Sequence, residues 1–143
     1  MHFKFRGQRI DNKEWVYGDL QSHIDGDMNR KAISIWEDGK TVYYEVVPET
    51  VCLYTLRKDK NNKELYVKDI VKGNVYGRDN KKYPFIGVIK YINYNIMVEG
   101  IFSCTGFTFP LINVYDIEKI GDKVVDTGVI DPESPKYLFA HEE

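Results

Sequence analysis

The sequence has few of the residues from which proteins build reactive or metal-binding sites. Its 143 residues include two cysteines, Cys52 and Cys104, and three histidines, His2, His23 and His141. The cysteines form no Cys-x-x-Cys pair and the histidines no His-x-x-x-His pair, so the usual zinc patterns are missing. We expect both cysteines to be free thiols in apolar surroundings. We predict no catalytic residue, no metal ligand and no cofactor, and therefore no enzymatic activity.

An excess of charge is also missing, as are long apolar runs. The formal net charge is −2, whereas a strongly basic chain would indicate a phosphate-backbone partner. No uncharged apolar run reaches the ~18 residues that a membrane span requires. The N-terminus, residues 1–6, has no apolar signal-peptide core. We expect a cytoplasmic protein with no membrane partner.

Ligand-binding loops are missing too. The eleven glycines fall singly at expected turns and form no phosphate-binding loop. Asp25–Asn29 begins like a calcium loop, but Arg30 and Trp36 stand where such a loop needs a glycine and a bidentate glutamate. We interpret the segment as a solvated acidic loop.

What the sequence does contain is a strong β signal. Aromatic residues make up 14% of the chain, and they accompany many valines and isoleucines. Ala32–Trp36 and Thr41–Val47 alternate like strands, and Asp38-Gly39 between them is typical of a type I′ turn. This pair is the clearest hairpin in the sequence.

Further strands are separated by polar turns. They are expected at Thr50–Leu56, Glu64–Val67, Val71–Tyr76, Phe85–Tyr91, Asn95–Phe102 and Phe107–Tyr115. Asn61 and Asn62 tolerate the left-handed region, so the turn before Glu64 needs no glycine. Short strands at this spacing favour an all-β barrel or sandwich.

One short phrase occurs twice in the chain. Asn12–Leu20 and Asn62–Ile70 share Asn, Lys, Glu and Asp at matching places. We interpret Asp19 and Asp69 as strand-end residues that accept hydrogen bonds from nearby turn N–H groups, with a catalytic role as the alternative. Two explanations of the repeated phrase are open: a duplication of the segment, or the independent use of the same residue types at two similar turn–strand junctions.

Two groups of aromatic residues form the candidate interaction surface. Lysines and aromatics interleave from Lys81 to Tyr94, a pattern that fits either base stacking in a nucleic-acid site or core aromatics with lysines at exposed edges. The tryptophans and Tyr17 fit either the core or a subunit interface. The candidate residues are Trp15, Tyr17, Trp36, Lys82, Lys90, Tyr91 and Tyr94.

Several segments in order resemble a known family. Lys4–Leu20 is similar to the N-terminal motif of the YopX-like proteins of phages and prophages. Val47–Val51 and the segments from Tyr54 to Val71 resemble the central motif, and Glu118–Gly121 resembles the C-terminal one. The resemblance implies a phage-encoded, mainly β protein that assembles as an oligomer. It implies no established activity, because the function of the family is unknown.

The chain departs from the family pattern at four glycine positions. They hold Cys52, Leu56, Asn62 and Lys68. A side chain at such a position puts the local backbone conformation in doubt, although asparagine can keep a left-handed turn.

These observations predict an all-β protein of three parts. Residues 1–56 form an N-terminal β unit, 57–123 a small SH3-like barrel on which that unit packs, and 124–143 a C-terminal extension. The leading hypothesis is a phage accessory protein in the host cytoplasm that acts through protein contacts, as a homo-oligomer. The alternative is a nucleic-acid-binding module of phage replication, recombination or transcription.

Overall fold

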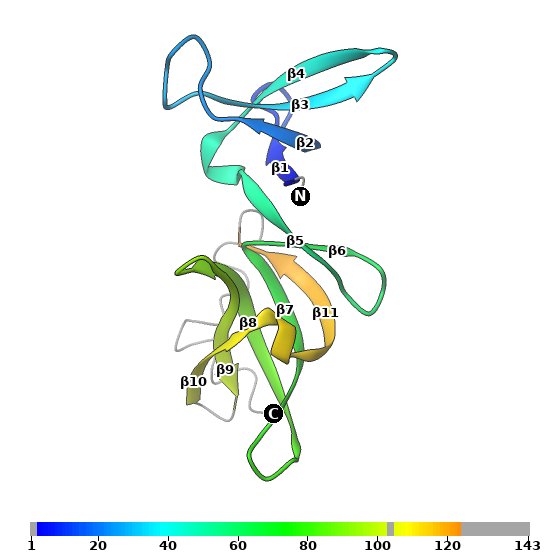
Figure 1. The fold of residues 1–143 in the computed structure, drawn as a ribbon, viewed down its shortest axis with the longest axis vertical. Coiled ribbons are helices and arrows are strands. Elements are labelled where there is room, and N and C mark those ends of the chain that lie inside the picture. Colours follow the sequence, from blue (N-terminus) through cyan, green and yellow to red (C-terminus); the bar gives the residue numbers. More distant parts are fainter. Residues whose placement is uncertain (1–2, 103–104, 124–143) are drawn as a thin grey trace. The chain divides into compact units, whose positions relative to one another are not determined.

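The computed structural model describes residues 3–102 and 105–123 of the chain. The predicted extension 124–143 and Cys104 lie outside these residues. The chain divides into two compact units, Met1–Tyr54 and Thr55–Glu143 (Figure 1). Within the described residues every regular element is a strand or a short 3-10 turn, which confirms the predicted all-β class.

The first unit is a meander of antiparallel strands. Its elements are β1 (Phe5–Gln8), β2 (Trp15–Gln21), β3 (Lys31–Glu37), β4 (Lys40–Val46), the 3-10 turn η1 (Pro48–Thr50) and the start of β5 (Cys52–Lys58). The strand order is β4-β3-β2-β1-β5. A bridge between Arg9 and Val46 brings the end of β4 back to the segment after β1, so the sheet curls at that end.

The hairpin between β3 and β4 is the one that the sequence predicts. Asp38 and Gly39 have φ values of 49° and 79°, as a type I′ turn requires. Seven residue pairs, from Glu37–Lys40 to Lys31–Val46, continue the ladder in register. The register places Trp36 opposite Thr41 and Ser34 opposite Tyr43.

One face of this sheet forms the core of the first unit. Val16, Ile33 and Val46 are buried there, and partly buried apolar residues pack against them: Phe5, Leu20, Ile35, Tyr44 and Val51. Gly18 is required where β2 meets β3, because a Cβ atom at this position would lie 2.2 Å from the carbonyl oxygen of Ser34. The glycine in the first copy of the repeated phrase therefore permits a close backbone approach.

The second unit is built on a five-stranded antiparallel sheet. Its elements after β5 are β6 (Glu64–Tyr66), β7 (Asp69–Tyr76), β8 (Lys82–Ile92), β9 (Asn95–Phe102), β10 (Thr105–Pro110), η2 (Leu111–Asn113) and β11 (Tyr115–Asp122). The sheet order is β10-β9-β8-β7-β11. β10 and β11 are its two edges, and no pairing among the described strands joins them, so the predicted SH3-like barrel is not closed.

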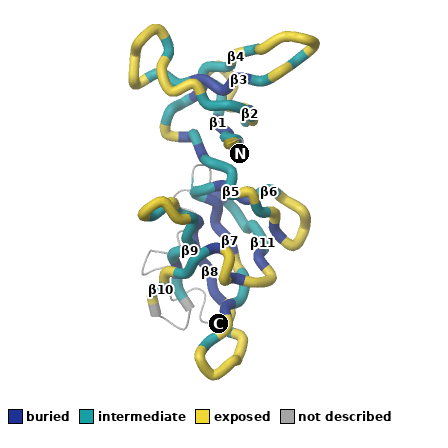
Figure 2. The backbone as a smooth tube through the Cα atoms, in the orientation of Figure 1, coloured by how far each residue is buried: buried dark blue, intermediate teal, exposed yellow. Residues whose placement is uncertain are grey.

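The core of the second unit lies along these strands (Figure 2). Its buried members are Leu65, Val71, Val75, Phe85, Ile89, Val98, Leu111, Val114 and Ile117. Arg57 supports the turn η2 from β5: its guanidinium donates to the backbone carbonyls of Leu111 and Val114. Burial lowers the pKa of Arg57 from its ordinary value.

Three local predictions are wrong, one in the first unit and two in the second. Asp19, in the first unit, is not a strand-end residue, since β2 continues to Gln21. In the second unit the expected strand Phe107–Tyr115 is interrupted by η2, because the chain turns after Pro110 and begins the separate edge strand β11 at Tyr115. Asp69 begins β7 instead of ending the preceding strand.

Candidate interaction surface

The face of the first sheet opposite its core carries a set of aromatic side chains. Trp15 and Tyr17 alternate along β2, and Trp36 and Tyr43 lie on the same face of β3 and β4, as the registers of the three strands require. We call these four residues the aromatic face. Tyr17 is 44% exposed, Tyr43 62% and Trp36 72%.

Two cations lie over the rings at one side of this face. The Lys4 ammonium is 5.8 Å from the centroid of the Tyr17 ring and 5.6 Å from that of Tyr54. The Arg6 guanidinium is 4.5 Å from the Trp15 ring and is only 3% exposed. These are the distances of cation–π contacts, which hold Trp15 and Tyr17 in place on the sheet.

Small residues separate the larger side chains. Ala32 and Ser34 share this face and are buried beneath their neighbours. The Ser34 hydroxyl lies 3.5 Å from the carbonyl oxygen of Asp19, to which it donates, and the Gln21 amide donates to it at 3.4 Å.

At the margin of the aromatic face, Arg30 donates twice to the Glu45 carboxylate, at 2.7 and 3.0 Å. The pKa of Glu45 is lowered by this hydrogen-bonded pairing.

The structure thus brings three of the predicted residues together: Trp15, Tyr17 and Trp36. Sequence reasoning missed Tyr43, Lys4 and Tyr54. The register fixed by Asp38-Gly39 was a usable signal for Tyr43, because it puts the odd-numbered positions of β4 on the face of Trp36.

The other four predicted residues lie in the second unit and do not form one basic surface. Lys82 begins the 11-residue strand β8, and Lys90 and Tyr91 lie near its other end. Each lysine has an acidic neighbour: Lys82 is 3.3 Å from Asp116, and Lys90 is 2.8 Å from Glu99. These ion pairs reduce the positive charge available to a phosphate backbone.

Tyr94 occupies an unusual position at the tip of the β8–β9 hairpin. It is 90% exposed and has a φ of 66°, next to Asn93 at 50°. Its ring meets that of Tyr91 edge to face, with 6.5 Å between centroids. A bulky residue in the left-handed region is rare, so the expected strands Phe85–Tyr91 and Asn95–Phe102 predict a turn here but not this conformation of Tyr94.

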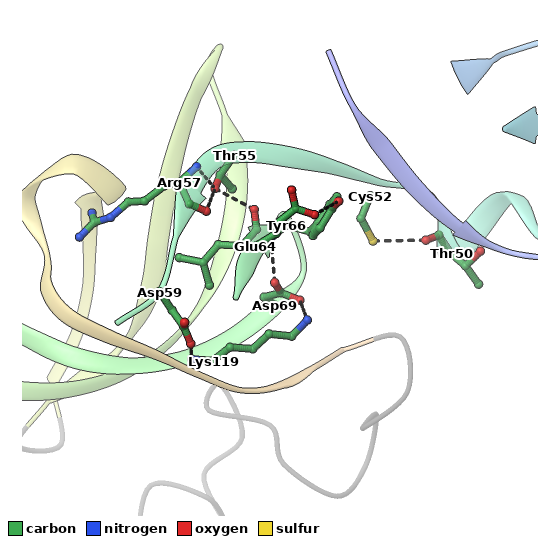
Figure 3. A network of polar contacts seen from close by, with 10 residues as sticks. Thr50, Cys52, Thr55, Arg57, Asp59, Glu64, Tyr66, Asp69 and Lys119 are labelled. Atoms are coloured by element: carbon green, nitrogen blue, oxygen red, sulfur yellow. Dashed lines mark hydrogen bonds and ion pairs between the residues drawn. The ribbon is translucent and has the colours of Figure 1, made fainter. Parts of the chain in front are cut away.

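A network of buried carboxylates lies elsewhere in the second unit (Figure 3). Asp69 is fully buried; it accepts the N–H of Tyr66 at 2.7 Å and lies 3.2 Å from the Lys119 ammonium. Asp69 therefore accepts a nearby backbone N–H, but the donor is the last residue of β6 and not the turn residue that was predicted. Asp59 accepts the N–H groups of Asn61 and Lys63 through one oxygen and that of Lys119 through the other.

The pKa of Asp59 lies below its ordinary value. Burial acts to raise the pKa. The three backbone hydrogen bonds, led by that of Lys119, stabilise the carboxylate and lower the pKa by more than burial raises it. Both carboxylate oxygens of Asp59 thus accept hydrogen bonds from backbone N–H groups. We interpret the network as a structural link between the β5–β6 turn and β11.

Within residues 3–102 and 105–123, no group of His, Cys, Asp or Glu side chains is arranged to hold a metal ion. The same residues contain no helix long and apolar enough to cross a membrane.

Comparison with known proteins identifies the family. The family model described as YopX protein matches residues 4–123, and the chain therefore belongs to that family. The resemblance inferred from the sequence motifs is confirmed. No curated protein matches the chain.

Proposed function

We propose that this YopX-family protein is a phage- or prophage-encoded accessory protein that acts through protein contacts and not through catalysis. It works as a homo-oligomer in the host cytoplasm. The observation that carries the proposal is the aromatic face, where Tyr17, Trp36 and Tyr43 are exposed on one side of one sheet. Aromatic residues are enriched in subunit interfaces, and an exposed apolar patch on a small domain marks an interaction site.

The polar groups of the second unit support a non-catalytic role. Asp59 and Asp69 are buried acids of this unit, and both accept backbone N–H groups. An acid that holds together turns and strands serves the fold, whereas a catalytic acid needs access to a substrate.

Analytical ultracentrifugation of the full chain at micromolar concentration tests the proposal. We expect a species heavier than the 16.7 kDa monomer. The double variant Trp36→Ser/Tyr43→Ser should shift it toward the monomer. The matched control is Tyr76→Ser, which removes a tyrosine that is 48% exposed on β7. A clean wild-type monomer contradicts the proposal.

A second candidate function is single-stranded nucleic-acid binding by the same face. The observation in its favour is Lys4, which lies beside two aromatic rings, since bases stack on aromatic residues while cations contact the phosphates. Fluorescence anisotropy with labelled oligonucleotides at low salt tests it. Binding should weaken with salt and fall in Lys4→Glu, or in Lys82→Glu and Lys90→Glu if β8 is used instead. Absence of binding at low salt removes this candidate.

A further inference from the structure

The outer edge of β4 presents backbone groups that no described residue pairs with. The carbonyl of Glu45 points away from β3, because it accepts the N–H of Ile10 at 3.1 Å. Peptide directions alternate along an antiparallel strand, so the N–H and C=O groups of Tyr43 and Thr41 point the same way. Within the described part of the chain β4 pairs only with β3, apart from the bridge at Val46.

The other sheet edges are protected in ways that this one is not. β6 has only three residues. The carbonyl of Ile117 on β11 accepts the N–H of Lys60, and β10 ends in Pro110, which has no N–H. β4 has seven residues with no proline, and its single lysine is at its first position. Proteins usually protect long edges, so an unprotected edge indicates a strand partner.

We propose that two copies of this chain join through β4, an inference that rests on the proposed homo-oligomer. The strands run antiparallel about a two-fold axis at Thr41, and the two sheets become one. Only a symmetric antiparallel pairing lets the backbone N–H and C=O groups of the same edge hydrogen-bond to each other in both copies. The aromatic side chains beside this edge, Trp36 and Tyr43, then cover the seam from both copies.

The groups that already occupy the edge limit where the two-fold axis can lie. Ile10 and Arg9 lie against Glu45 and Val46, so a second strand can extend only as far as Tyr44. An axis at Tyr43 would place Lys40 of the second copy against Val46, where Arg9 already lies. An axis at Thr41 or at Val42 avoids this. We place the axis at Thr41, because it sets the two threonines in a hydrogen-bonded pair, a favourable cross-strand combination.

A charge-swap experiment tests the register. Thr41→Lys and Thr41→Glu each place like charges opposite one another at the axis, so each variant should dimerise about tenfold more weakly than the wild type. An equimolar mixture of the two variants places Lys opposite Glu, and we expect the dimer to return at low salt. This recovery also shows that both variants are folded.

Thr108→Lys and Thr108→Glu are the matched controls, because Thr108 is an exposed threonine on a different edge strand, β10. They should leave the dimer intact. If both Thr41 variants remain fully oligomeric, the β4 seam is wrong while the proposed homo-oligomer stands. A monomeric wild type overturns both. Loss of association in each Thr41 variant without recovery in the mixture overturns the two-fold register.

Discussion

The backbone N–H of Lys119 on β11 donates to Oδ2 of Asp59 over 2.9 Å, across 60 residues of sequence. The other oxygen of Asp59 accepts two N–H groups of its own turn. One side chain therefore closes the β5–β6 turn and fastens it to the edge of the five-stranded sheet.

Replacing Asp59 by asparagine should destabilise the second unit. The amide nitrogen of asparagine cannot accept a hydrogen bond, so either Lys119 or the turn loses its acceptor in a buried place. We expect a loss of about 1–3 kcal/mol in the free energy of unfolding. Urea unfolding followed by circular dichroism measures it. Asp25→Asn in an exposed loop is the control, and an equal effect of both variants would refute the assignment.

The stabilisation by Asp59 should depend on pH in one direction. Its pKa is lowered in the folded chain relative to about 3.9 in the unfolded one, so the folded state binds fewer protons. The stabilisation by Asp59 is fully present at pH values above its unfolded-state pKa, and it is lost as the pH falls through its folded-state pKa. The stability difference between wild type and Asp59→Asn should therefore be constant from pH 7 to about pH 5 and shrink below pH 4. A difference that stays constant down to pH 2 would exclude a role for the charge.

Gly18→Ala should disrupt the first unit. The new Cβ would lie 2.2 Å from the Ser34 carbonyl oxygen, which belongs to backbone and cannot rotate away. Forced separation of β2 and β3 should cost roughly 1–3 kcal/mol. Hydrogen exchange of the β2–β3 amides should accelerate. Gly106→Ala on β10 meets nothing within 4 Å and should leave the stability almost unchanged.

Lys68→Gly should stabilise the second unit. Lys68 has a φ of 82°, a conformation that costs a residue with a side chain roughly 1–2 kcal/mol. Glycine avoids this cost, but its greater conformational freedom in the unfolded chain offsets part of the gain. We expect a net gain of about 0.5–1 kcal/mol, measured by thermal unfolding. Lys81→Gly is the control, since Lys81 is an exposed lysine outside the strands without a positive φ. A lower melting temperature for Lys68→Gly than for that control would contradict the argument.

The family resemblance and the backbone conformation agree at three of the four glycine positions. Of the four places where the family pattern has glycine, Leu56, Asn62 and Lys68 have φ values of 67°, 67° and 82°. The left-handed backbone is kept although the glycines are gone. Cys52 has no positive φ; it is a buried strand residue whose thiol donates to the carbonyl of Thr50.

Local signals predicted the local structure well. Asp38-Gly39 predicted the β3–β4 hairpin, because its backbone preference acts over a few residues. The left-handed conformation of Tyr94 at the β8–β9 tip was missed, because the ladder between β8 and β9 imposes φ values that a tyrosine does not prefer. The pairing of β11 with β7 likewise depends on packing between distant segments, to which no local pattern corresponds.

The candidate surface was predicted in part for the same reason. Trp15, Tyr17 and Trp36 were selected by residue type, and the strand registers then placed them on one face. Lys82 and Lys90 were selected by their closeness in sequence, but an extended strand separates them. The two copies of the repeated phrase also differ: Lys13 is the left-handed residue of the first copy, whereas the second copy has two, Asn62 and Lys68.

The distribution of tryptophan gives the molecule its own optical reporter. Both indoles belong to the first unit; the ring of one lies against a guanidinium, and that of the other, Trp36, is 72% exposed. Selectively excited tryptophan emission therefore reports on the first unit, which carries the proposed contact face, and does not report on the second unit. Iodide quenching of Trp36 as a function of protein concentration can follow assembly without any label, with Trp36→Phe to isolate the signal of Trp15.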